Sequence, residues 1–189
     1  MPNVTKTTLV QSAMQFAFLQ RLSIAHERSL RSIANLDEDL VCSEPVTGGW
    51  TIKDILGHVV TWNGEFRCAI RIILEKEKPR HAQIIPQEVD FDEWNEVQIA
   101  RKRKWSWKRI RADLERDYSE AVELIVSLQP KEFRKRGITA WVYSPPKEMS
   151  KFLHGRVESV ETLVTYHWRH MNQHSRMIET WREQNGYTF

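Results

Sequence analysis

The chain has 189 residues, with 28 lysine and arginine side chains against 25 acidic ones, so its formal net charge is only +3. This length fits one domain, which we expect to span residues 1–189 with its core at about 9–183. The near balance of charge argues against nucleic-acid binding, because such proteins gather a clear basic excess on one face. No apolar run approaches the roughly 20 residues of a membrane helix, and Met1 to Thr8 lack the apolar core of a signal peptide. We therefore expect a cytoplasmic protein that binds neither nucleic acid nor membranes, with Cys42 and Cys68 reduced.

Seven glycines and seven prolines are few breaks for this length, which favours long helices over many short strands. The first predicted helix covers about 8–34, where apolar residues such as Phe16 and Ile24 recur at near-helical spacing. A connection over 35–47 and a turn at Gly48-Gly49 follow. The sequence therefore begins with one long amphipathic helix.

The second predicted helix has a well-defined start. Thr51 is a favourable N-cap, and Asp54 three residues later can complete a capping box. The apolar pattern that follows continues until Pro79, which should end the helix after about 26 residues. Such a length is natural in a helical bundle.

Three further elements are predicted in chain order: a short helix over 92–104, a long helix from a Ser106 cap to Pro130, and a last helix from Glu158 or Ser159 to Glu183. We interpret the basic run at 101–104 as a solvated helix end. The connection over 130–156 contains aromatic residues and is either a lid over a site or a flap covering the core. Four long helices of this kind predict an all-α fold, a four-helix bundle with a short extra helix.

The last helix carries imidazoles where a bundle seam normally has leucine. Its seam positions alternate at three and four residues and include His167, His170 and His174. His170 and His174 project from one face, one turn apart, a spacing that suits two nitrogens on one metal ion. A third ligand must come from another helix, and we select His58, which borders the apolar face of the second helix. The alternative is that these are hydrogen-bonded core histidines that bind no ion.

Three neutral imidazoles would accept a divalent ion such as Zn²⁺, Ni²⁺ or Fe²⁺. Three protein ligands leave a position open, as in catalytic sites, where bound water can act as nucleophile or base. Asp54 and Glu65 lie one and two turns from His58 and are candidate carboxylates to orient it. No GxSxG, P-loop or GxGxxG pattern offers a catalytic group beyond the metal site. The other histidines are interpreted as surface or loop residues: His26, His81 and His154.

Three segments resemble the DinB-like superfamily. GWTIKDILGH at 49–58, followed by Trp62, is similar to the second helix of that superfamily, and HMNQH at 170–174 is similar to its last helix. The segment DEWN at 92–95, with the basic residues after it, also matches. The chain departs from many relatives at 175–177, where Ser-Arg-Met replaces a Gly-Gln pair. His167 is outside the usual triad and is a fourth ligand, an orienting group or a bystander.

The resemblance implies an up-down-down-up bundle with a long crossover connection, often assembled as a homodimer. It also implies a metal triad of His58, His170 and His174. The superfamily includes thiol-dependent transferases, a maleylpyruvate isomerase and many members without an assigned activity. We therefore expect a metal-dependent thiol S-transferase or hydrolase, in which a low-molecular-weight thiol or water is activated to attack a small electrophile. The alternatives are a non-catalytic small-ligand-binding protein and a stress-linked dimeric interaction protein.

Overall fold

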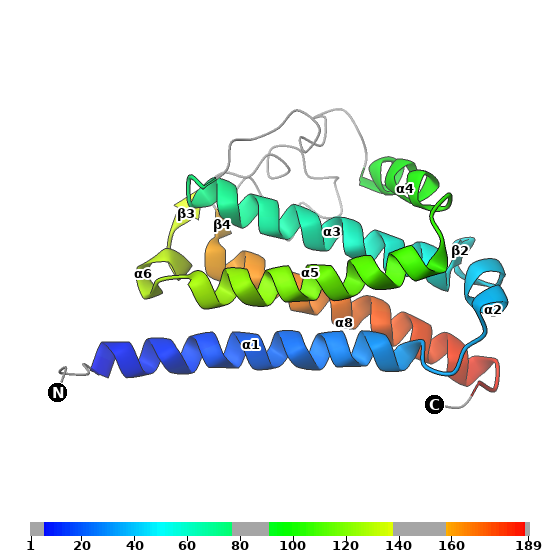
Figure 1. The fold of residues 1–189 in the computed structure, drawn as a ribbon, viewed down its shortest axis with the longest axis horizontal. Helices are drawn as coiled ribbons and strands as arrows, with labels where there is room; N and C mark the ends of the chain where they lie inside the picture. Colours follow the sequence, from blue (N-terminus) through cyan, green and yellow to red (C-terminus); the bar gives the residue numbers. More distant parts are fainter. Residues whose placement is uncertain (1–5, 77–90, 138–157, 188–189) are drawn as a thin grey trace.

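The structure, a computed structural model, describes residues 6–76, 91–137 and 158–187. Its four long helices are α1 (Lys6–Ser32), α3 (Ile52–Ile73), α5 (Trp107–Ser127) and α8 (Val160–Gln184). Helices α1 and α8 run in one direction while α3 and α5 run in the other, which is the up-down-down-up order (Figure 1). Both α1 and α3 pack against α5 and α8. The prediction of an all-α four-helix bundle is confirmed.

Shorter elements join the long helices: α2 (Glu38–Ser43), α4 (Phe91–Lys102), α6 (Pro130–Phe133), and two antiparallel ribbons, β1 (Pro45–Thr47) with β2 (Trp50–Thr51) and β3 (Arg136–Gly137) with β4 (Glu158–Ser159). Of these, the sequence predicts only α4 and the turn at Gly48 and Gly49, whose φ angles of 53° and 82° suit a tight hairpin. The sequence predicts that Pro130 ends the third long helix, but α5 ends at Ser127. Pro130 instead begins α6. Proline suits the first position of a helix, because the N–H that it lacks would have no partner there.

Hydroxyl side chains fix the starts of three long helices. The Asp54 N–H donates to Thr51 Oγ1 at 3.2 Å, and the Thr51 N–H donates to the Asp54 carboxylate at 3.2 Å, so the predicted capping box is present. Ser106 and Ser159 cap α5 and α8 through one such bond each. These bonds satisfy N–H groups that have no partner within the helix. They also set the position along α3 and α8 at which the histidines lie.

Helix α3 ends at Ile73, well before the predicted end at Pro79. Glu75 adopts a positive φ of 60°, and its N–H donates to a carbonyl of the last helical turn at 2.9 Å. The Lys76 N–H donates to another of these carbonyls at 2.8 Å, which completes a Schellman motif. The helix is therefore closed by its own backbone bonds, and Pro79 lies outside the described residues.

The bundle core is apolar, with Leu22, Ile55, Leu114 and Leu163 among its fully buried side chains. None of the helices in the described ranges is both long and apolar enough to cross a membrane. Large apolar residues thus gather inside the bundle, where their burial supplies most of the driving force for folding.

The apolar stripe predicted for α1 is confirmed at Leu19, Leu30 and Ile33, which lie in or against the core, and is wrong at Phe16 and Ile24. Phe16 and Ile24 are 67% and 55% exposed, whereas Ala25 and Ser29 are buried. The buried face of α1 carries Phe18 and Leu22 together with the small side chains of Ala25 and Ser29, which allow close packing on α8. Phe16 and Ile24 were therefore assigned to the wrong face of the helix.

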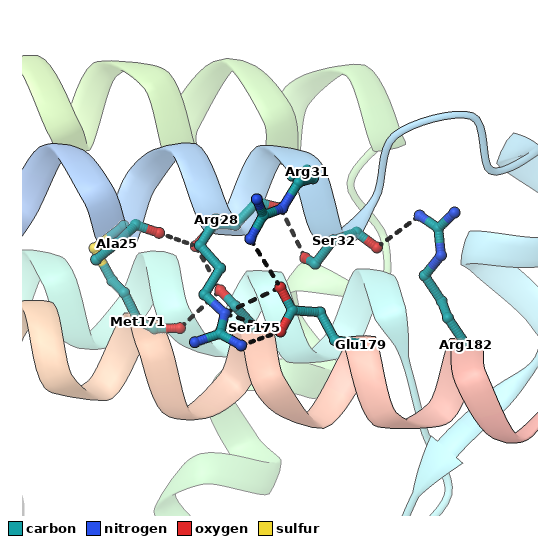
Figure 2. Close-up of polar contacts among 9 residues, drawn as sticks. Ala25, Arg28, Arg31, Ser32, Met171, Ser175, Glu179 and Arg182 are labelled. Atoms are coloured by element: carbon teal, nitrogen blue, oxygen red, sulfur yellow. Dashed lines mark hydrogen bonds and ion pairs between the residues drawn. The ribbon is translucent and has the colours of Figure 1, made fainter. Parts of the chain in front are cut away.

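The contact between α1 and α8 is a polar seam (Figure 2). Arg28 Nε donates to the Glu179 carboxylate at 2.8 Å, and both groups are largely buried. The hydroxyls of Ser29 and Ser175 lie 2.8 Å apart, so one donates to the other, while the accepting hydroxyl donates to a carbonyl of its own helix. These directional bonds fix the register of α8 against α1, and hence the height of the α8 histidines in the bundle.

Arg182 extends this seam to the end of α1 (Figure 2). Its side chain is fully buried and donates to the carbonyls of Ser32 and Ala34 at 3.1 and 2.8 Å. Ser32 is the last residue of α1 and Ala34 lies two positions beyond it, where a helix end leaves acceptors without an intrahelical donor. The guanidinium therefore acts as a C-terminal cap supplied by another helix.

His26 is buried in the bundle, contrary to the prediction of a surface residue. Its ring stacks on Tyr118 with centroids 4.1 Å apart, and its Nε2 lies 2.9 Å from the Glu115 carboxylate. The stacking and the hydrogen bond compensate for burying the imidazole. His81 and His154 lie outside the described residues.

Candidate metal centre

Three imidazoles converge between α3 and α8. His58 comes from α3, whereas His170 and His174 come from α8, which packs against α3. The Nε2 atom of His170 lies 3.1 Å from that of His58 and 3.1 Å from that of His174. One ligand nitrogen from each residue lies within 4.8 Å of the others. The structure thus brings together the three side chains selected from the sequence.

Local structure positions each ring. His170 and His174 are four residues apart on α8, so both project from one face. His58 lies one turn beyond the capping box of α3, between two aromatic side chains. The Trp50 and Trp62 rings are 5.2 and 6.3 Å from it, centroid to centroid. These neighbours restrict the rotamers of His58 and direct its Nε2 toward α8.

The arrangement of the three nitrogens suits coordination of a divalent ion better than hydrogen bonding among the imidazoles. Two ligands at the Zn–N distance of about 2.0–2.1 Å stand about 3.3 Å apart on a tetrahedral ion. Two of the observed separations are 3.1 Å. A ring nitrogen carries either one proton or one lone pair, so His170 Nε2 can form a hydrogen bond with only one of its two close neighbours. An ion could accept a lone pair from all three.

Burial keeps these imidazoles neutral, which is the form that binds metal ions. Desolvation lowers the pKa of His58 to about 3, and the charges of His174 and Lys102 act in the same direction. Desolvation lowers the pKa of His174 to about 4. The pKa of His170 lies well below its ordinary value, again mainly through burial. The cluster therefore offers three lone pairs at neutral pH without first releasing protons.

The same shifts predict a pH-dependent stability of the metal-free protein. The folded-state pKa values of His58 and His174 lie below 6.5, so the unfolded chain binds more protons as the pH falls below that value. The free energy of unfolding should then drop by on the order of 1 kcal/mol per pH unit for each such imidazole. Urea denaturation between about pH 7 and 5 measures this slope. A free energy that stays constant over this range would show that the imidazoles protonate freely in the folded state.

The two candidate carboxylates do not contact the imidazoles. Asp54 is held by Thr51 and by Arg103, whose Nε lies 3.2 Å from both carboxylate oxygens. Glu65 forms no hydrogen bond within the described ranges. The Nδ1 atoms of His170 and His174 are buried and have no hydrogen-bond partner among the described residues. An orienting role for either carboxylate therefore has no contact to support it.

His167 lies beside the cluster and contributes no atom to it. The residue is buried one turn before His170, and its ring stacks on Phe66 with centroids 5.9 Å apart. Burial, aided by the charge of Arg67, lowers its pKa to about 3. Its Nε2 is buried without a hydrogen-bond partner in the described part of the chain. Its position resembles that of a neutral core residue more than that of a fourth ligand.

Helix α4 covers α3 beside the cluster through contacts that the sequence reasoning missed. Lys102 Nζ donates to the Gly57 carbonyl at 3.0 Å and to Thr61 Oγ1 at 2.6 Å. Lys102 belongs to the basic run interpreted as a solvated helix end, and that interpretation is wrong for this residue, whereas Arg103 is exposed although it pairs with Asp54. Because Lys102 has the same local pattern as its exposed neighbours Arg101, Arg103 and Lys104, nothing in the sequence could have distinguished it.

The fold and the site define a class of protein, a four-helix bundle with three imidazoles converging from two of its helices. This chain belongs to the DinB superfamily, whose family model matches residues 21–178. The match includes His58, His170 and His174, and it confirms the resemblance noted in the sequence. Membership is compatible with a metal-binding enzyme and with binding of small molecules, and it assigns neither a reaction nor a substrate.

Two solved structures are similar in fold. An uncharacterized protein from Clostridium difficile 630 has a TM-score of 0.71 and 12% sequence identity, covering 89% of this chain and 95% of that one. A protein from Streptococcus pneumoniae has a TM-score of 0.66 and 11% identity, covering 89% of this chain and 90% of that one. At such identities the likeness establishes the fold alone. No curated protein sequence matches the chain.

Proposed function

We propose that this protein is a metal-dependent enzyme of the thiol S-transferase or hydrolase type. The observation that carries the proposal is the convergence of Nε2 atoms from His58, His170 and His174, with two separations of 3.1 Å. These residues would hold one divalent ion, Zn²⁺, Ni²⁺ or Fe²⁺. When bound, the ion supplies Lewis acidity, which lowers the pKa of a thiol or a water and so activates it for attack on a small electrophile.

The chain's own residues support this chemistry in two ways. Neutral imidazoles add no positive charge, so the charge of the ion remains available to stabilise an anionic nucleophile. Aromatic rings of Trp50 and Trp62 beside His58 limit access of water, which strengthens electrostatic interactions at the site. Three protein ligands also leave room in the coordination sphere for a substrate.

The remaining parts of the proposal concern partners and setting. The co-substrate is a low-molecular-weight thiol, and the second substrate is a small electrophilic molecule. The protein is one domain over residues 1–189 and acts as a cytoplasmic homodimer. Cys42 and Cys68 form no disulfide, which agrees with a reducing compartment.

Metal removal tests the proposed function. Zn²⁺-loaded protein should transfer L-cysteine to the fluorogenic electrophile monochlorobimane, and chelation should reduce turnover by about 100-fold or more, since the ion supplies several kcal/mol of the activation. Adding Zn²⁺ back to the chelated protein should restore the rate. Full turnover by the metal-free protein would contradict the mechanism. A protein that binds Zn²⁺ and transfers no thiol would favour a non-catalytic binding role.

A further inference from the structure

One face of α3 carries a row of polar and aromatic side chains that lead away from His58. Its members are Asp54, His58, Thr61, Trp62 and Glu65. Residues 58 and 65 are seven positions apart, so Glu65 lies on nearly the same face as His58, two turns and about 10.5 Å further along the helix. This row faces α4 and the histidine cluster.

Within the described ranges, every polar side chain of this row except Glu65 has a hydrogen-bond partner. Asp54 is held by Thr51 and Arg103. Thr61 Oγ1 accepts from Lys102 at 2.6 Å, and Trp62 Nε1 donates to the Asn95 side chain at 3.0 Å. Among the described residues, Glu65 has no hydrogen bond and no ion pair. A half-buried carboxyl group with no such contact has no evident structural role.

The histidine cluster extends along α3 toward Glu65. The His170 ring lies 6.1 Å from the Trp62 ring and 6.0 Å from the Phe66 ring, centroid to centroid. Trp62 and Phe66 enclose the helical turn that carries Glu65. The turn of α3 that carries Glu65 therefore lies at the level of the His170 ring.

The charge environment of Glu65 suits proton transfer near neutral pH. Burial raises the pKa of the Glu65 carboxyl to about 7, against the opposing effect of the Lys102 ammonium from α4. A carboxyl group with such a pKa can both accept and release a proton at the pH of the cell. The neighbouring imidazoles of α3 and α8 are neutral, so the pKa of Glu65 depends on burial and on the charge of Lys102.

We propose that Glu65 is the general base of the reaction, placed on α3 two turns from His58, with no hydrogen bond or ion pair to another described residue. The sulfur or oxygen of the attacking thiol or water forms a bond to the electrophilic atom as the bond from that atom to the leaving group breaks. The nucleophile loses its proton to the Glu65 carboxylate, which becomes a neutral carboxylic acid. That acid then gives the same proton to the leaving group or to solvent, so the charge and the proton are balanced over one turnover. This inference rests on the proposed function, since it assigns a catalytic residue to that reaction.

Glu65→Gln tests the inference, because the amide keeps the shape of the side chain and cannot accept the proton. In the Zn²⁺-loaded protein, turnover of L-cysteine and monochlorobimane should fall about 100-fold, with KM little changed and one equivalent of metal retained. The acidic limb of the rate–pH profile, set by Glu65 in the wild type, should be lost. Glu65→Asp should recover part of the rate, and Glu123→Gln, at an exposed glutamate, should behave as wild type.

Proton release gives a second measurement that does not depend on turnover. Co²⁺-loaded protein is titrated calorimetrically with β-mercaptoethanol in two buffers of different ionisation enthalpy, while the visible absorption of Co²⁺ reports thiol binding. The wild type should release fewer protons to the buffer than Glu65→Gln, because Glu65 retains the proton of the thiol. Equal proton release or equal turnover in the two proteins would overturn the role of Glu65. Absence of thiol binding and of turnover in the wild type would instead refute the proposed function, and the role of Glu65 with it.

Discussion

Replacing His170 with alanine is expected to abolish stoichiometric metal binding. His170 Nε2 is the central atom of the cluster, 3.1 Å from the nitrogens of both His58 and His174. Loss of an outer-sphere partner alone costs metal sites about 10–100-fold in affinity, so loss of the central ligand should cost more than about 100-fold. Elemental analysis of untagged protein, loaded with Zn²⁺ and dialysed, measures the effect directly. The wild type should retain one ion per chain.

Gln173→Ala is the matched control for this change. Gln173 lies on the same helix between His170 and His174 but is exposed, so its loss should leave the metal content unchanged. Added Zn²⁺ should raise the midpoint of thermal unfolding for wild type and control, and it should leave His170→Ala unaffected, because only a ligand bound by the native state stabilises it. Retention of a full equivalent by His170→Ala would place the ion elsewhere.

Replacing Arg67 with alanine should destabilise the bundle by about 3–5 kcal/mol, the usual result of removing one partner from a buried ion pair. Arg67 Nη2 lies 2.7 Å from the Asp117 carboxylate and 2.9 Å from that of Glu120, and the Arg67 and Asp117 side chains are almost fully buried. The substitution would leave Asp117 without its cation in a setting where burial already raises its pKa. Urea denaturation at neutral pH measures the loss of unfolding free energy.

The double variant Arg67→Met with Asp117→Leu separates the loss of one partner from the value of the pair. Two apolar side chains of similar size leave no buried charge, and such replacements are often neutral or stabilising by about 1–4 kcal/mol relative to the pair. The double variant should therefore be clearly more stable than Arg67→Ala. Equal instability of the two proteins would mean that packing volume, and not the unpaired carboxylate, accounts for the loss.

The histidine cluster could be predicted from the sequence because its signals are local. His170 and His174 share a helical face through their spacing alone, and the seam pattern places that face inside the bundle. Thr51 and Asp54 mark the start of α3, which fixes the position of His58 on its helix. Helical periodicity and capping chemistry both act within a few residues, so the sequence contains the information needed.

The features that were missed depend on contacts between distant parts of the chain. Lys102 reaches Gly57 and Thr61 across 45 and 41 positions, and no local pattern marks it among four consecutive basic residues. The buried face of α1 follows the close approach of α8 at Ser29, so the large apolar Phe16 is left exposed. Such choices are made by packing, and local residue preferences do not encode them.

The central claim is that three imidazoles from two helices bind one divalent ion, and X-ray absorption at the zinc edge of the Zn²⁺-loaded protein tests it most directly. The account predicts three imidazole nitrogens at about 2.0–2.1 Å and at least one further light ligand from solvent. Loss of one imidazole signal should accompany His58→Ala, the ligand contributed by α3. A spectrum with fewer than three imidazoles in the wild type, or one unaffected by His58→Ala, would contradict the account.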